Sequence, residues 1–341
     1  MKFQIKTFFA AALAGMIMSG SAMAADITGA GSTFVYPILS KWSAAYPGGS
    51  RINYQSIGSG GGIAQIKAKT VTFGASDKPM SIADLNAAGL TQFPVIVGGI
   101  TVVIHVPGIQ AGQLVLDGPT VADIYLGKIT KWNDPAIRKL NPKAPLPNMN
   151  ILVVHRSDGS GTTFIYANYL SKVSPEWASK VGADTAIEWP VGIGGKGNEG
   201  VAGTVNQLAG SIGYVEYAYA MQNHMAYTKL INRAGKALDP NIDTFRAGAA
   251  GADWVGAASQ EFNMVLVNQP GDNAWPITGA TWAIMYKNPR DKAASAEALK
   301  FFKWAYENGD KEAISLQYVP LPDNAVKAIE ASWKGIQGSG M

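Results

Sequence analysis

The most constraining feature of this sequence is its alternation of short, apolar, β-rich runs with amphipathic helical segments. Strands are predicted over residues 51–58, 71–75, 94–106, 151–154, 211–217 and 277–286. Helices are predicted between several of these strands, with capping boxes expected at Ser81-x-x-Asp84 and Thr120-x-x-Asp123. This alternation favours an α/β fold whose layers are built on largely parallel sheets.

Two long apolar runs, near residues 94–106 and 277–287, bracket the middle of the chain. We expect the chain to leave one lobe near His105 and to return near Ile277. The predicted first lobe is residues 25–105 plus 278–341, and the predicted second lobe is residues 106–277. A two-lobed architecture with two crossing segments follows from this division.

The first 24 residues read as a cleaved export signal. Lys2 and Lys6 precede an apolar run over residues 7–20, and Ala22-Met23-Ala24 has the small-x-small pattern of a cleavage site. The apolar run is shorter than the ~20 residues that a membrane helix needs. Without Lys2 and Lys6 the formal net charge falls from +4 to +2, and the other basic residues form no stripe. Nucleic acid is therefore excluded as an expected partner.

The residue counts narrow the chemistry further. The sequence has no Cys, which excludes disulfides, thiolate metal sites and a Cys nucleophile. Its three His residues are widely spaced, so a His-built metal site is not expected. We also expect no cofactor. An exported chain without disulfides is expected in a bacterial periplasm.

Three segments rich in glycine and hydroxyl groups, residues 29–34, 58–62 and 158–163, each precede a predicted helix. The first turn of a helix presents unpaired N–H groups and a partial positive charge. Glycine lets an anion approach the backbone closely, and Ser or Thr hydroxyls add donors. One such segment is also how an ordinary N-cap looks. Three in one chain predict an oxyanion site.

Arg156 and Asp77 complete this predicted site. The planar fork of Arg156 can hold two oxygens of a tetrahedral anion, and Asp158 can orient it. The alternative is a surface Arg–Asp pair of little energetic value. Asp77 is by default a turn residue. Inside an anion site, however, its carboxylate would repel any anion without a proton to donate, which would admit phosphate and reject sulfate.

Other motifs favour different functions less well. Residues 192–197 match G-x-G-x-x-G, but Pro190 interrupts the strand expected before a dinucleotide site, and Lys196 is followed by Gly rather than by the Ser or Thr of a P-loop. No G-x-S-x-G elbow surrounds Ser32, Ser59 or Ser160.

At these residues the sequence resembles the periplasmic phosphate-binding proteins of high-affinity phosphate ABC transporters, which are type II periplasmic binding proteins. The resemblance covers nearly the whole chain after residue 24. The segments that carry it are residues 28–34, 53–62, 73–77, 123–129, 156–162 and 210–216.

The resemblance implies a two-lobed fold that closes on a hinge and buries phosphate between its lobes. It implies as donors Thr33, the Phe34 backbone N–H, Ser59, Arg156, Ser160, the Gly161 backbone N–H and Thr162. Asp77 would accept the proton of hydrogen phosphate, and Asp158 would brace Arg156. Ser32, Gly60 and His155 depart from the family's common residues. The first two are expected only to tune flexibility, and His155 to lower the positive field at the rim.

The function favoured is therefore a monomeric receptor that binds inorganic phosphate and delivers it to the permease of a phosphate ABC transporter. It would not be an enzyme. Two alternatives stay open. One is a phosphatase with Ser160 or Thr33 as nucleophile, for which no base is placed nearby in the sequence. The other is a receptor for sulfate or molybdate, which Asp77 disfavours.

Overall fold

The computed structural model describes residues 26–340, so the predicted export signal over residues 1–24 lies outside the described residues. The strands are β1 (Ile27–Gly31), β2 (Ile52–Ser56), β3 (Phe73–Ser76), β4 (Leu90–His105), β5 (Val115–Asp117), β6 (Leu152–Arg156), β7 (Ile193–Gly195), β8 (Ser211–Glu216), β9 (Ala226–Tyr227), β10 (Lys229–Ile231), β11 (Ala237–Leu238) and β12 (Thr278–Tyr286).

Helices connect or follow most of these strands, as the α/β prediction requires. They are α1 (Tyr36–Ala45), α2 (Ser59–Lys67), α3 (Ile82–Ala88), α4 (Gly118–Tyr125), α5 (Pro135–Leu140), α6 (Gly161–Val173), α7 (Pro175–Lys180), α8 (Gly197–Gln207), α9 (Tyr217–Gln222), α10 (Ile242–Ala249), α11 (Trp254–Ala257), α12 (Lys292–Asn308), α13 (Asp310–Ser315) and α14 (Asp323–Ser332), with 3₁₀ turns η1 (Ala258–Gln260) and η2 (Trp333–Gly335).

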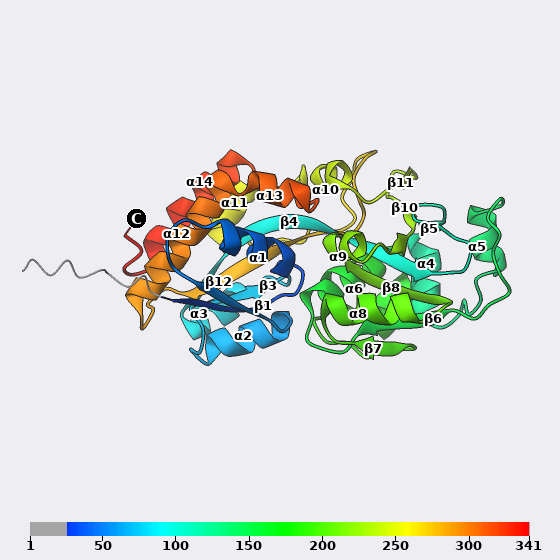
Figure 1. Cartoon of the computed structure of the whole chain (residues 1–341), viewed down its shortest axis with the longest axis horizontal. Coiled ribbons are helices and arrows are strands. Elements are labelled where there is room, and N and C mark those ends of the chain that lie inside the picture. Colours follow the sequence, from blue (N-terminus) through cyan, green and yellow to red (C-terminus); the bar gives the residue numbers. More distant parts are fainter. Residues whose placement is uncertain (1–25, 341) are drawn as a thin grey trace, which may run out of the picture.

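The main sheet joins two halves of the molecule in the order β2-β1-β3-β12-β4-β8-β6-β7. In the first half, β1 runs parallel to β2 and β3, and β12 runs antiparallel to β3 and β4. In the second half, β6 runs parallel to β7 and β8. A small sheet, β11-β10-β5, lies on the side of the second half. The N-terminal and C-terminal segments gather in the first half, and the middle of the chain forms the second (Figure 1).

Strand β4 belongs to both halves. Residues 90–99 pair with β12, and residues 100–105 pair with β8. The predicted strand began at residue 94, whereas the observed one begins at Leu90. Pro94 lies at a shift of register, where Trp282 pairs with Pro94 and Thr281 with Ile96. A bulge accommodates the missing N–H of proline, so Pro94 does not end the strand.

The division into two lobes stays a prediction. The contacts of residues 254–263 suggest a different boundary between the lobes. The indole of Trp282 donates to the backbone oxygen of Phe262 (3.0 Å), and Gln92 donates to that of Glu261 (3.1 Å). A division by these contacts assigns 254–263 to the first half. The sequence-based boundary places it in the second lobe.

Neither predicted capping box forms in full, although Ser81 does cap a helix. The Asp84 carboxylate accepts from the Ser81 hydroxyl (2.7 Å) and not from the Ser81 backbone N–H that a capping box requires. The Ser81 hydroxyl accepts from the backbone of Asp84 (3.1 Å) and caps α3. The box predicted at Thr120 is wrong, because Thr120 itself donates its backbone N–H to the Asp117 carboxylate (2.9 Å). Helix α4 therefore begins two residues earlier than Thr120, with Asp117 as its cap.

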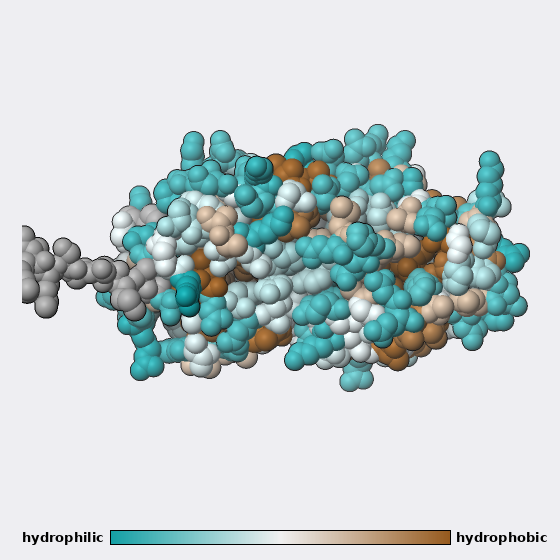
Figure 2. All heavy atoms as spheres, in the orientation of Figure 1, coloured by the Kyte–Doolittle hydropathy of each residue, from teal (hydrophilic) through white to brown (hydrophobic). Residues whose placement is uncertain are grey.

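Buried aliphatic and aromatic side chains form a core that continues through both halves. Trp42, Phe93 and Phe302 belong to its first half, and Tyr166 and Tyr214 to its second. Hydrophilic side chains cover most of the face seen in Figure 2, with scattered hydrophobic patches. Within residues 26–340, no helix combines the length and the apolarity needed to cross a bilayer.

Candidate functional site

The eight predicted ligand-binding residues all lie in the seam between the two halves and are all buried. Thr33 and Phe34 follow β1, Ser59 begins α2 after β2, and Asp77 follows β3. In the second half, Arg156 ends β6, and residues 160–162 begin α6. Because parallel strands end at one edge of a sheet, residues that follow them meet there.

On the side of the first half, Asp77 is held by hydroxyl groups. Its Oδ1 accepts from Ser32 (2.5 Å) and from Thr281 (2.6 Å), and its backbone N–H donates to the Ser59 hydroxyl (3.1 Å). Its second oxygen, Oδ2, is buried and has no partner among the described residues. An unpaired buried carboxylate oxygen is costly, so it marks a place for a donor.

Burial raises the pKa of Asp77 to about 6. The hydroxyls of Ser32, Thr281 and Ser59 and the charge of Arg156 oppose this rise, because they stabilise the carboxylate form. At neutral pH the group is therefore an ionised acceptor.

On the side of the second half, Arg156 is locked by Asp158. Its Nε and Nη2 donate to the two oxygens of that carboxylate (2.8 and 2.6 Å), and the backbone N–H of Gly197 donates there too (3.0 Å). The remaining nitrogen, Nη1, is buried without a partner among the described residues. Burial acts to lower the pKa of Arg156, but the Asp158 carboxylate outweighs it and raises that pKa. The guanidinium is thus a fixed cation with one free edge.

The start of α6 presses against the first half. The Ser160 hydroxyl accepts from the backbone of Thr163 (3.0 Å) and caps the helix. A side chain added at Gly161 would lie 2.5 Å from the Ser59 hydroxyl, and the Gly60 N–H donates to the Gly159 carbonyl (2.8 Å). Only glycine at position 161 permits this close approach of the two halves.

The sequence interpretation missed Asn198, which joins the two halves. Its amide nitrogen donates to the hydroxyls of Thr33 (2.7 Å) and Thr162 (3.2 Å), and its Oδ1 accepts from the backbone of Glu216 (2.9 Å). A signal was present in the glycine run 192–197, because it is a fourth glycine-rich segment before a helix.

Ser32 has contacts that the sequence-based expectation did not include. Its hydroxyl contacts Asp77 directly and also accepts the backbone N–H of Phe34 (3.0 Å). It therefore does more than tune flexibility, and it engages an N–H that was expected to bind the ligand. Thr281 was missed as well, and a threonine inside a strand gives no sequence signal of this contact. His155 stacks on Trp189 with ring centroids 4.8 Å apart, and burial lowers its pKa.

Each of the four hydroxyl groups predicted to bind the ligand accepts a hydrogen bond. Thr33 and Thr162 accept from Asn198, Ser59 accepts from Asp77, and Ser160 accepts from Thr163. A hydroxyl that accepts still has its own proton to donate. Together with Arg156, these groups bring several donors to a seam that contains one free acceptor, Oδ2 of Asp77. This donor and acceptor set fits a tetrahedral oxyanion that still carries a proton.

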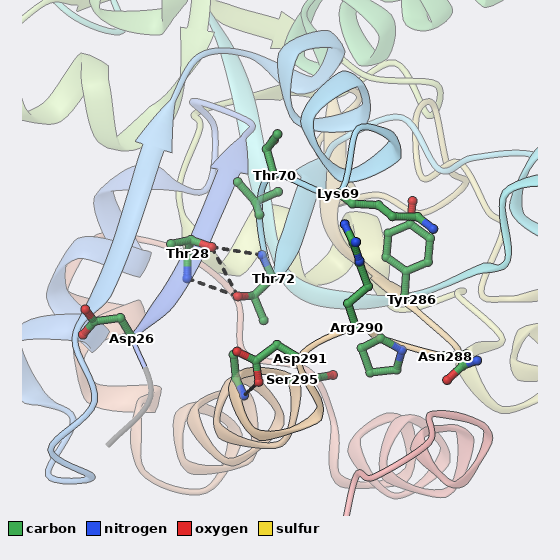
Figure 3. A pocket seen from close by; sticks show the side chains of 13 residues that line it. Asp26, Thr28, Lys69, Thr70, Thr72, Tyr286, Asn288, Arg290, Asp291 and Ser295 are labelled. Atoms are coloured by element: carbon green, nitrogen blue, oxygen red, sulfur yellow. Dashed lines mark hydrogen bonds between the residues drawn. The ribbon is translucent and has the colours of Figure 1, made fainter. Parts of the chain in front are cut away.

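A hollow in the first half contains none of the predicted residues. Its volume is about 240 Å³, and its walls include Thr28, Lys69, Thr72, Arg290 and Asp291. Figure 3 shows Thr28 and Thr72 hydrogen-bonded to each other at one wall. Across residues 26–340, no group of three or more His, Asp or Glu side chains has the arrangement of a metal site.

Comparison with known proteins shows the family of this chain. The profile of the PBP superfamily domain matches residues 19–308. The phosphate-binding protein PstS of Xylella fastidiosa is 56% identical over 309 residues, which span 90% of this chain and 84% of that protein.

Two solved structures have the same fold at low sequence identity. The high affinity periplasmic phosphate-binding protein PfluDING, bound with phosphate at pH 8.5, superposes with a TM-score of 0.72 at 18% identity over 92% of this chain and 98% of that one. An ABC-type phosphate transport receptor from Vibrio cholerae has a TM-score of 0.54 at 16% identity, over 87% of this chain and 100% of that one. By its match to the domain profile and to PstS, this chain belongs to the PstS family of phosphate-binding proteins within the PBP superfamily.

Proposed function

We propose that this protein binds hydrogen phosphate in the seam between its two halves and releases it by opening that seam. The proposed donors are Thr33, Ser59, Arg156, Ser160, Gly161 and Thr162, the proposed acceptor is Asp77, and Asp158 is the brace of Arg156. Phe34, also predicted as a donor, gives its N–H to Ser32 and would have to share it with the ligand.

The observation that carries the proposal is that two buried polar atoms of the site have no partner among the described residues. One is an acceptor, Oδ2 of Asp77, and the other is a donor, Nη1 of Arg156. A ligand that satisfies both must donate one hydrogen bond and accept several. Hydrogen phosphate does this at neutral pH, whereas sulfate has no proton to donate. Rejection of sulfate then follows from the cost of placing a bare oxygen against a buried carboxylate.

The wider role we propose is that of an exported periplasmic receptor. It acts as a monomer and delivers phosphate to the membrane permease of an ABC transporter, and no bond is made or broken. Family membership supports this role, and so does the interlobe position of the site. Ligand binding would shift the population toward the closed arrangement, because the ligand contacts both halves only when they meet.

Calorimetric titration of the protein with phosphate and with sulfate at about pH 8 tests the proposal. We expect phosphate to bind at least about 100-fold more tightly than sulfate, since a buried unpaired charge costs several kcal/mol. Sulfate binding as tight as phosphate would overturn it.

The variant Asp77→Asn sharpens the same test. Its amide can donate to an unprotonated oxygen, so we expect the preference for phosphate over sulfate to fall by about tenfold or more. The variant Asp84→Asn, at an exposed residue in the first turn of α3, is the matched control. An unchanged preference in Asp77→Asn would make Asp77 only a turn residue.

A further inference from the structure

The hydroxyl of Ser32 both accepts and donates a hydrogen bond inside the site. Its oxygen accepts the backbone N–H of Phe34 (3.0 Å), and its proton is given to Oδ1 of Asp77 (2.5 Å). The residue is completely buried, so no water competes for that proton.

Oδ1 of Asp77 therefore receives two donors, Ser32 from the segment after β1 and Thr281 from β12. With Oδ1 satisfied, Oδ2 is the oxygen left for the ligand. Both donors also stabilise the charged form of the carboxyl group, because a hydroxyl that donates to a carboxylate loses that bond or weakens it when the oxygen is protonated.

Few of the charged and titratable groups around Asp77 stabilise its ionised form. Arg156, from β6, favours the carboxylate. Burial raises the pKa values of Glu216, Tyr54 and Tyr318, and the Asp77 charge adds to the rise in each. None of these three supplies a positive charge, so the hydroxyls and Arg156 alone oppose the effect of burial on Asp77.

We propose that Ser32 is a specificity-determining positioning residue, which keeps Asp77 ionised and thereby sets the pH below which the site admits a tetrahedral anion without a proton. This proposal rests on the proposed function. Once Asp77 is protonated, Oδ2 carries a donor instead of a free acceptor. The site then presents donors only, and sulfate fits it. Loss of the Ser32 hydroxyl moves this change to higher pH.

The test is calorimetric titration with sodium sulfate and with sodium phosphate from about pH 5 to about pH 8. In the wild-type protein, sulfate affinity should increase as the pH falls through about 6, the value to which burial raises the pKa of Asp77. In Ser32→Ala, we expect the onset of sulfate binding about one pH unit higher, since a hydrogen bond to a charged group is of the size of one pKa shift of that amount.

The ratio of sulfate to phosphate affinity is the informative quantity. Ser32→Ala also frees the N–H of Phe34, but an amide donates to either anion, so this second effect is the same for both ligands. Ser211→Ala is the matched control, because Ser211 is equally buried and donates to the Val205 carbonyl (3.0 Å) in the second half. Its onset should equal that of the wild type. If Ser32→Ala does not fold, Ser32→Gly removes the same hydroxyl.

The variant Asp77→Asn separates the mechanisms. In that background sulfate affinity should show no rise as the pH falls through about 6, and adding Ser32→Ala should not change its dependence on pH. An unchanged onset in Ser32→Ala, with phosphate binding intact, overturns the role of Ser32 and leaves the proposed function standing. Absence of phosphate binding by the wild type at about pH 8 would instead overturn the proposed function.

Discussion

The two halves of the molecule bring opposite chemistry to the seam. The first half presents a carboxylate, Asp77, held by hydroxyls, and the second half presents a guanidinium, Arg156, held by the carboxylate of Asp158. Counted together, these charges sum to one negative charge when both carboxyl groups are ionised. Attraction of an anion must therefore come from oriented donors rather than from net charge.

The two aspartates show how environment decides the role of one residue type. Burial raises the pKa of Asp77 to about 6. Burial acts in the same direction on Asp158, but its hydrogen bonds to Arg156 prevail and lower its pKa. We infer that selection of the ligand resides in the first half, and that the cation of the site resides in the second half while both halves supply neutral donors.

The largest expected effect comes from removing the cation of the second half. Arg156→Met should weaken phosphate binding by about 100- to 1,000-fold, because truncating one partner of a buried charged pair costs several kcal/mol. Arg156→Lys keeps the charge but loses the fork, so its loss should be smaller. Arg246→Met, at an exposed pair with Asp243, is the control for calorimetry. If Arg156→Met bound phosphate as tightly as the wild type, the cation of the second half would not attract the ligand.

Next in size is a difference in how the two aspartates affect stability without phosphate. The raised pKa of Asp77 means that its stabilising contribution is present at low pH and is lost as the pH rises through about 6. As the pH rises from about 4 to about 8, the stability of Asp77→Asn relative to the wild type should therefore increase by about 2 kcal/mol. Urea unfolding at both pH values measures this difference.

Asp158 should give the opposite dependence on pH. Because its pKa is lowered, its contribution is present at neutral pH and is lost as the pH falls through the acidic range. The variant Asp158→Asn should lose most stability relative to the wild type at neutral pH. If the stability of both variants relative to the wild type changed with pH in the same direction, the pKa values of the two carboxyl groups would not be shifted in opposite directions.

The sequence predicted the residues of the seam better than it predicted their connections. Glycine-rich helix starts identified Thr33, Ser59 and Ser160, because the need for close approach leaves a trace in composition. Thr281 and Asn198 were missed because their contacts depend on strand order and on how the halves meet, which no local pattern encodes. The early start of β4 likewise depends on its pairing with β12.

A smaller effect is expected from the side chain that links the halves. Asn198→Ala should weaken phosphate binding by about tenfold, because Thr33 and Thr162 lose their shared donor and the Glu216 N–H is left unpaired. The exposed Asn206→Ala, which loses a bond to the Asn223 carbonyl, is the control. An effect confined to unfolding temperature, with binding unchanged, would show that Asn198 stabilises the second half only.

The smallest effect should come from the rim of the seam. Lys78, after β3, pairs with Asp184 of the second half (2.7 Å) and lies over the Phe164 ring, and both charged side chains are substantially exposed. An exposed ion pair contributes little, so Lys78→Gln should weaken phosphate binding by about threefold or less at low salt. The effect should vanish at high salt, because screening removes attraction between exposed charges. A larger, salt-independent loss would place Lys78 in contact with the ligand, and the first half would then supply a cation as well as the selective carboxylate.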